Sequence, residues 1–306
     1  MSLKLLFMGT PEFAVPILQS ISNSNHKVAG VYTQPPKKKF RGQKILESPI
    51  HTASKKLNFQ IRYPKNLNNE EELNYISKLA PDVVVVVAYG QIIPKKILSI
   101  QNIDFINVHA SLLPKWRGAA PIQRSIMERD SETGVTIMKI ISKLDSGPYM
   151  MQEKIKIEKY FNYHDLTEKL SYLGAKLIIQ SLNLIENIKA NFINQDDSKA
   201  TYAKKIEKKE CKIKWNIPAK NLVAKINGLS PFPGAWFEHK KNRLKIIKAE
   251  EIDLNGKEGE IIDDNLIIGC LKNSIKILEI QKEGKKTLNT KDFLSGYKIK
   301  KGEKLT

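Results

Sequence analysis

Asn107 and His109 are polar side chains at the end of an apolar segment, and their types and spacing could support chemistry. The segment 103–109 has the apolar, β-branched composition of a buried strand. Alternate residues of a strand point to the same face, so both side chains would reach one point. An amide and an imidazole that donate to a single oxygen can stabilise an oxyanion during acyl transfer. The same two residues could instead be a turn cap and a structural histidine.

Strand and helix patterns alternate along the chain before this pair. Short apolar strands are expected at 3–9, 27–34, 61–64, 81–89 and 103–109, and helices at 11–24, 48–59 and 69–80. The alternation predicts a doubly wound, mostly parallel, Rossmann-like α/β sheet. In such sheets ligands bind at the carboxyl ends of the strands, where Asn107 and His109 would lie.

The pattern changes after residue 150. An edge strand at 151–159 and a long amphipathic helix at 165–188 precede a polar connector. Brief strands separated by Gly, Asn and Asp turns then predict a small, OB-like β-barrel. We expect a first domain over residues 1–189, a linker over 190–206 and a basic β-barrel domain over 207–306.

The chain is strongly basic. Its 51 Lys and Arg exceed its 32 Asp and Glu and give a formal net charge of +19. Residues 201–306 hold 24 Lys or Arg against 14 Asp or Glu, so the second domain is about twice as basic per residue as the first. A polyanion is the natural partner for such a surface, although lysines spread evenly as a solvated surface would give the same composition.

Cysteine and histidine usage points away from disulfides and metal sites. Cys211 and Cys270 are the two cysteines, and they form neither a zinc spacing nor a disulfide framework. The four other histidines are scattered, so no metal is expected. The N-terminal apolar run is too interrupted for a signal peptide, and no segment approaches 18 uninterrupted apolar residues. We expect a soluble, cytoplasmic monomer.

Long motifs around Asn107 resemble the formyltransferases that use 10-formyltetrahydrofolate. They are HASLLPKWRGAAPIQRSI at 109–126 and GVTIMKIISKLDSGPYM at 134–150. Within that family the whole chain is most similar to the methionyl-tRNA formyltransferase branch, through LLFMGTPEFAVPIL, ATYAKKI and GLSPFPGAWF. The resemblance implies that Asn107, His109 and Asp145 are catalytic. It implies 10-formyltetrahydrofolate as donor cosubstrate and initiator methionyl-tRNA as acceptor.

The resemblance also implies where the folate would bind. It places the pterin near the central strand ends and beside the signature loop 111–118. The expected folate-binding residues are Ala88, Tyr89, Gly90, Gln91, Ile92, Pro94, Ser111, Leu112, Leu113 and Pro114. From the residues alone, the run around Tyr89 is a buried strand with its turn, and Asp145 is a turn aspartate or helix cap.

A basic segment at 33–44 lacks an apolar period and is expected to be an exposed, flexible loop. By itself it could be a solvated surface loop. The resemblance implies that it enters the tRNA acceptor stem and that Arg41 matches a functional arginine. The expected tRNA-binding residues are Lys37, Lys38, Lys39, Arg41 and Lys44. Trp116 and Trp236 could stack on nucleotides or pack internally, and neither is expected to be catalytic.

Three other functions fit parts of the chain. A glycinamide ribonucleotide formyltransferase is expected to carry a Gly-rich phosphate turn after the first strand, where MGTPEFA has one glycine. A sugar-nucleotide formyltransferase resembles the N-terminal half more closely, but its bifunctional versions continue into a dinucleotide-binding domain, and no G-x-G-x-x-G follows residue 150. A noncatalytic tRNA-binding module would explain the charge and leave Asn107, His109 and Asp145 unexplained.

Overall fold

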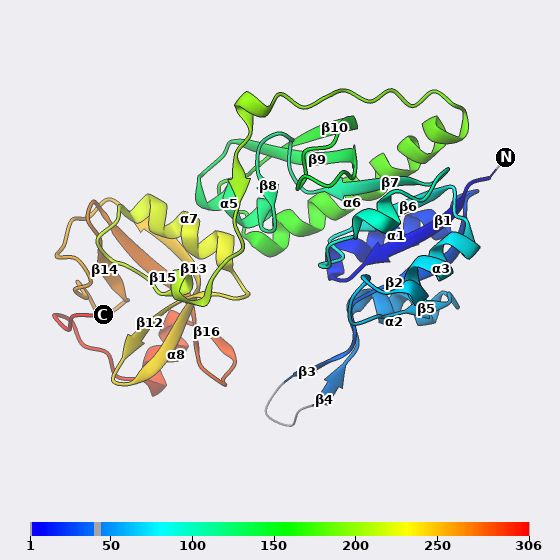
Figure 1. Ribbon diagram of the computed structural model, residues 1–306. Coiled ribbons are helices and arrows are strands. Elements are labelled where there is room, and N and C mark those ends of the chain that lie inside the picture. Colours follow the sequence, from blue (N-terminus) through cyan, green and yellow to red (C-terminus); the bar gives the residue numbers. More distant parts are fainter. Residues whose placement is uncertain (1, 40–43, 306) are drawn as a thin grey trace. The chain divides into compact units, whose positions relative to one another are not determined.

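A computed structural model describes residues 2–39 and 44–305, which divide into two compact units (Figure 1). The first unit comprises Met1–Gly118, Thr133–Ile155 and Thr167–Tyr202. The second comprises Ala119–Glu132, Lys156–Leu166 and Ala203–Thr306. None of the helices in the described ranges is long and apolar enough to cross a membrane.

The first unit is built on a seven-stranded sheet in the order β10-β9-β7-β6-β1-β2-β5. The strands are β1 (Lys4–Gly9), β2 (Lys27–Tyr32), β5 (Ile61–Arg62), β6 (Val83–Val87), β7 (Asp104–His109), β9 (Glu132–Lys139) and β10 (Tyr149–Lys156). Strands β5, β2, β1, β6 and β7 run parallel, and β9 joins β7 antiparallel. The expected mostly parallel α/β sheet is confirmed.

Five consecutive valines explain the central place of β6. All five are buried, as in a strand covered by helices on both faces. The crossover helices of this sheet are η1 (Glu12–Ala14) with α1 (Val15–Ser22), α2 (Pro49–Lys56), α3 (Glu70–Leu79) and α4 (Lys95–Leu98). Ser48 and Asn69 cap α2 and α3 by accepting from backbone N–H groups, which stabilises each helix at the start its sequence predicts.

The basic segment after β2 contains regular structure. Strands β3 (Lys37–Lys39) and β4 (Lys44–Leu46) pair antiparallel, and they extend from the end of β2 as a hairpin (Figure 1). The prediction of a loop without strands was wrong at these two ranges. Paired strands satisfy the backbone N–H and C=O groups of a segment that has no apolar face to bury.

The second unit is an antiparallel β domain, as expected. Its sheet has the order β12-β13-β15-β14, with β16 paired to β15. The strands are β12 (Ala235–His239), β13 (Asn242–Ile252), β14 (Ile267–Gly269), β15 (Ser274–Lys282) and β16 (Thr287–Asn289). Around Ile261 the chain pairs only through isolated bridges, Glu260 to Lys304 and Ile261 to Ile268.

An apolar core holds this antiparallel sheet to its helices. Fully buried Leu222, Phe237 and Ile246 belong to one cluster, and Trp215 meets the Phe237 ring edge-on at 5.7 Å. The remaining elements of the chain are β8 (Arg117–Gly118), α5 (Pro121–Met127), α6 (Tyr163–Glu186), η2 (Asp197–Lys199), β11 (Tyr202–Ala203), η3 (Lys208–Cys211), α7 (Ala219–Leu229) and α8 (Thr290–Gly296).

Candidate active site

Strand β7 places Asn107 and His109 on one face at its carboxyl end. Asn107 pairs with Val86 of β6 and Met138 of β9, so it sits between two strands near the edge where ligands bind in such sheets. Its side chain is half-buried, whereas His109 is buried. None of the described residues hydrogen-bonds the Asn107 amide, which leaves both of its N–H donors available.

The imidazole of His109 has an acceptor beside each ring nitrogen. Its Nε2 lies 3.0 Å from the backbone oxygen of Trp116. Since a carbonyl oxygen can only accept, Nε2 carries a proton. Its Nδ1 lies 3.9 Å from Oδ2 of Asp145, which is too long for a direct hydrogen bond. An imidazolium would therefore face a carboxylate and still have an Nδ1 proton to offer to a third group.

Asp145 comes from the turn between β9 and β10 and is held by its side chain. Its Oδ2 accepts a hydrogen bond from the backbone N–H of Gly118 at 2.8 Å. Its backbone adopts φ 45°, a left-handed conformation that is uncommon outside glycine. The structure thus brings Asp145 to His109 across 36 residues of sequence, a meeting that no sequence pattern specifies.

The signature loop 111–118 is fixed by its own polar atoms and by two strands. The fully buried Ser111 donates to the Lys115 carbonyl at 2.6 Å. Thr136 of β9 donates to the Ser111 carbonyl at 2.6 Å and accepts from the Leu113 N–H. Gln152 of β10 donates to the Leu113 carbonyl at 2.7 Å. Ser111 and Leu113 thus form the hydrogen bonds that fix the loop, whereas Leu112 and Pro114 are partly exposed.

The segment after β6 presents backbone and apolar surface. Ala88 and Gly90 are exposed, and the Ile92 side chain is 92% exposed. Tyr89 is buried below them, and burial raises the pKa of its phenol above the ordinary value. Thr10 donates to the Tyr89 carbonyl at 2.7 Å, and Gln34 to the Gly90 carbonyl at 2.9 Å.

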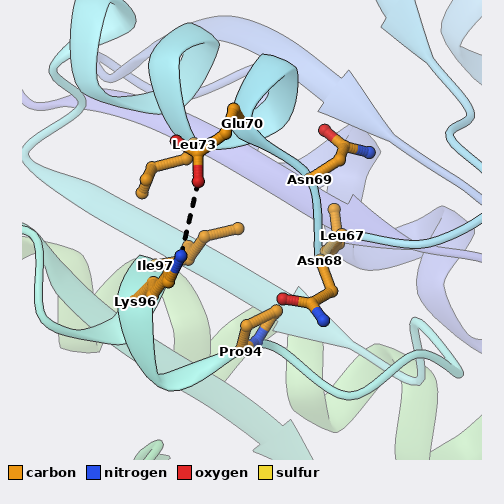
Figure 2. A pocket seen from close by; sticks show the side chains of 8 residues that line it. All are labelled: Leu67, Asn68, Asn69, Glu70, Leu73, Pro94, Lys96 and Ile97. Carbon is orange, nitrogen blue, oxygen red and sulfur yellow. Dashed lines mark hydrogen bonds and ion pairs between the residues drawn. The ribbon is translucent and has the colours of Figure 1, made fainter.

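The two remaining residues of the expected folate set lie beside this segment. Gln91 donates to the Pro64 carbonyl at 3.0 Å, and Pro94 precedes α4. Pro94 also lines a pocket of about 150 Å³ with residues of α3 and α4, in which the Glu70 carboxylate and the Lys96 amine face each other at 3.3 Å (Figure 2). The pocket is smaller than the roughly 300–1,000 Å³ of ordinary ligand sites, so we assign it no ligand.

Four of the five expected tRNA-binding residues lie on the basic hairpin formed by β3 and β4. Lys37 is exposed, and its amine donates to the Gln34 side chain at 2.6 Å. Lys38, Lys39 and Lys44 belong to β3 and β4. Arg41 lies outside the described residues. Gln34 contacts both Lys37 and the Gly90 carbonyl, so it links the root of the hairpin to the expected folate segment.

Aromatic and basic side chains meet on the second unit. The Arg243 guanidinium lies 3.9 Å from the ring centre of half-buried Trp236, and the Lys245 amine lies 5.8 Å from the ring centre of Phe232. Phe232 is 75% exposed. Such pairs combine a flat ring with positive charge, a combination suited to contact with nucleic acid.

Four residues that shape the site were not singled out by sequence patterns: Thr136, Gln152, Arg117 and Gln195. Thr136 and Gln152 are polar residues on strands whose inward direction only the sheet reveals. Arg117 lies in the signature loop 111–118, but no role was predicted for this residue. Gln195 carried no signal, since it lies in a polar connector. Within the described ranges, no group of three or more His, Cys, Asp or Glu could hold a metal ion.

Comparison with known proteins accounts for nearly the whole chain. Residues 3–182 match the formyl transferase family, and residues 205–298 match the formyl transferase C-terminal domain. The chain is 51% identical over 308 residues to the methionyl-tRNA formyltransferase of Pelagibacter ubique, which covers 100% of this chain and 99% of that protein. It is 40% identical over 311 residues to the methionyl-tRNA formyltransferase of Chelativorans sp., with full coverage of both.

Solved structures of lower identity share the fold. HypX from Aquifex aeolicus in complex with tetrahydrofolic acid has a TM-score of 0.65 at 14% identity, covering 100% of this chain and 51% of that chain. An N-formyltransferase from Helicobacter canadensis in complex with folinic acid and dTDP-3-aminofucose has a TM-score of 0.67 at 19% identity, covering 92% of this chain and 100% of that chain.

Proposed function

The chain belongs to the methionyl-tRNA formyltransferase family, and we propose that it transfers a formyl group from 10-formyltetrahydrofolate to methionine on initiator tRNA. The 51% identity over the full length supports this reaction. The observation that carries the assignment of residues is the 3.9 Å approach of Asp145 to His109, beside the available amide of Asn107.

In the proposed reaction the neutral α-amine attacks the formyl carbon. A carbon–nitrogen bond forms while the carbonyl electrons move to oxygen, which becomes negative as the attacking nitrogen becomes positive. That nitrogen loses a proton, N10 of the folate gains one, and the bond from carbon to N10 breaks as the carbonyl forms again. The products are formylmethionyl-tRNA and tetrahydrofolate.

Asn107 and His109 would stabilise the oxygen charge in this sequence. The Asn107 amide and the Nδ1 proton of His109 are the donors that the described side chains offer there. Loss of one such donor typically costs ~10²–10³ in rate. Asp145 would steady the imidazolium and help move the proton from the attacking amine toward N10.

The folate would bind against the segment after β6 and the signature loop. Exposed Ala88, Gly90 and Ile92 offer backbone groups and an uncovered apolar side chain. Leu112 and Pro114 offer partly exposed apolar surface. Tyr89, Ser111 and Leu113 are buried, so they would support the site from beneath.

Charge supports a tRNA partner. The basic hairpin and the second unit, which holds most of the residues in the more basic part of the chain, would contact tRNA phosphates. We propose a catalytic domain over 1–189, a linker over 190–206 and a tRNA-binding domain over 207–306. The protein would act as a monomer in the cytoplasm, where charged initiator tRNA is found.

An acceptor assay tests the proposed function. Purified protein with 10-formyltetrahydrofolate should formylate methionyl-tRNA and leave free methionine unmodified, and kcat/KM should fall steeply as salt rises, because phosphate contacts are screened. A 3-amino sugar nucleotide serves as the competing acceptor. Equal turnover on free methionine, or preference for the sugar nucleotide, would overturn the assignment.

A further inference from the structure

Arg117 is an arginine buried at the edge of the candidate site. Its side chain is 1% exposed and is the largest fully buried side chain among the described residues. Arginine is almost never fully buried unless it is paired, since a charge loses its hydration inside a protein. The contacts of this guanidinium therefore indicate why the fold retains it.

Two donors of Arg117 converge on one amide. Its Nε and Nη2 donate to Oε1 of Gln195 at 2.9 and 2.7 Å. Its Nη2 also lies 2.7 Å from a carboxylate oxygen of Asp197, a residue whose side chain is 60% exposed. Nη1 is buried and has no partner in the described part of the chain. The guanidinium thus orients Gln195, while the two N–H donors of its Nη1 have no acceptor among the described residues.

Gln195 in turn hydrogen-bonds the turn that carries Asp145. Its Nε2 donates to the Asp145 carbonyl at 3.0 Å and to the Gly147 carbonyl at 2.7 Å. Because a guanidinium only donates, Oε1 of Gln195 must face Arg117 and the NH₂ group must face the two carbonyls. The amide has no second orientation that satisfies all four bonds.

Asp145 is consequently held at two points by one dipeptide. Gly118, the neighbour of Arg117, donates its N–H to the Asp145 carboxylate at 2.8 Å. Through Gln195, the Arg117 side chain fixes the Asp145 carbonyl. The left-handed backbone of Asp145, with φ 45°, is costly for a non-glycine residue and persists only where its surroundings determine it.

We propose that Arg117 and Gln195 are positioning residues for formyl transfer, which fix the Asp145 carboxylate at its distance from His109 without contacting the reacting groups. This inference rests on the proposed function, because it assigns Asp145 a part in the reaction. A displacement of about 1 Å at a reacting centre can cost ~10² in rate, so a positioning residue can matter nearly as much as the residue it holds.

The isosteric variant Gln195→Glu tests the proposal. Its carboxylate still accepts from Arg117 but cannot donate to the Asp145 and Gly147 carbonyls. We expect kcat for methionyl-tRNA formylation to fall by about 10–10²-fold, with KM for both substrates within about twofold of the parent. Asp197→Asn is the matched control, since it alters another partner of the same guanidinium, and its kcat should stay within about twofold.

A double-variant cycle separates positioning from general stability. In an Asp145→Ala background, Gln195→Glu should lower kcat by less than about twofold, because the carboxylate it positions is gone. If Gln195→Glu lowers kcat equally with and without Asp145, or leaves kcat unchanged in the parent, the positioning inference fails. If Asp145→Ala alone keeps full activity, the proposed function of Asp145 fails instead.

Arg117→Lys and Arg117→Met provide a second pair of variants should Gln195→Glu not fold. Lysine can donate to Gln195 from one nitrogen, whereas methionine cannot donate at all. We expect kcat to fall in the order parent, lysine variant, methionine variant, and guanidinium ion to restore part of the methionine variant's kcat. Equal kcat values in folded lysine and methionine variants would overturn the proposal.

Discussion

The two units of the chain differ in what they bury. The first unit buries the charged side chains of Glu72 and Arg117 along with several hydroxyl and imidazole groups. In the described part of the second unit, the buried polar residues are three serines and His239, and no Asp, Glu, Lys or Arg is among them. One unit uses buried polar contacts to hold loops, and the other keeps its charge outside an apolar core.

This difference predicts that substitutions of buried residues in the first unit mainly change the rate of catalysis, and that those in the second unit mainly change stability. Buried polar bonds contribute modestly to stability, but they fix geometry, which matters most for catalysis. Apolar burial contributes stability in proportion to the area removed from water.

Phe237→Ala should destabilise the second unit by about 3–5 kcal/mol, because it empties a fully buried ring site beside Trp215. Chemical denaturation with tryptophan fluorescence as the readout measures this. The rate of formyl transfer per folded molecule should remain within about threefold. A stable Phe237→Ala protein would contradict the assignment of Phe237 to the core that holds this unit together.

Asn107→Ala should lower kcat by ~10²–10³, because it removes an oxyanion donor while changing little buried surface. The melting temperature should stay within a few degrees of the parent. Steady-state kinetics with thermal unfolding as a control separates the two effects. If Asn107→Ala unfolds the protein and leaves the turnover of the folded fraction unchanged, Asn107 contributes to stability and not to catalysis. The first unit would then not differ from the second in the way stated above.

Neutralising three exposed lysines of the second unit, Lys298, Lys300 and Lys301, should weaken tRNA use and leave chemistry intact. The slope of log kcat/KM against log salt should fall by about 1 for each tRNA phosphate that the variant no longer neutralises. The matched control neutralises three exposed lysines of the first unit, Lys56, Lys65 and Lys78. Equal slopes for the two triple variants would show that the lysines of the second unit contribute no more to tRNA binding than those of the first.

Lys225→Met should have the smallest effect on stability, and the size of that effect should depend on pH. Burial lowers the pKa of the Lys225 amine below its ordinary value of 10.5, so the unfolded chain binds more protons between the two pKa values. Parent stability should therefore rise relative to the variant as pH increases through that window. Urea titrations at pH 7 and pH 10 measure this, and a parent that loses stability relative to the variant between these two pH values would contradict the stated direction.

Local pattern predicted the strands and helices because each has a repeating apolar face. The valines of β6 are such an apolar signal. It also singled out Asn107 and His109, since they alternate at a strand end. The contact between Arg117 and Gln195 spans 78 residues and involves a connector without periodicity, so nothing local could reveal it. The β3–β4 hairpin was missed because its sequence has no apolar period.

The cycle that combines Asn107→Ala with His109→Ala tests the central claim most directly. Single-turnover formylation of methionyl-tRNA would be measured for the parent, both single variants and the double variant. If the two side chains share one oxygen charge, the double variant should be about as slow as the slower single variant. Rate losses that multiply in full would show that the two groups contribute independently and not as one unit, and would contradict the account.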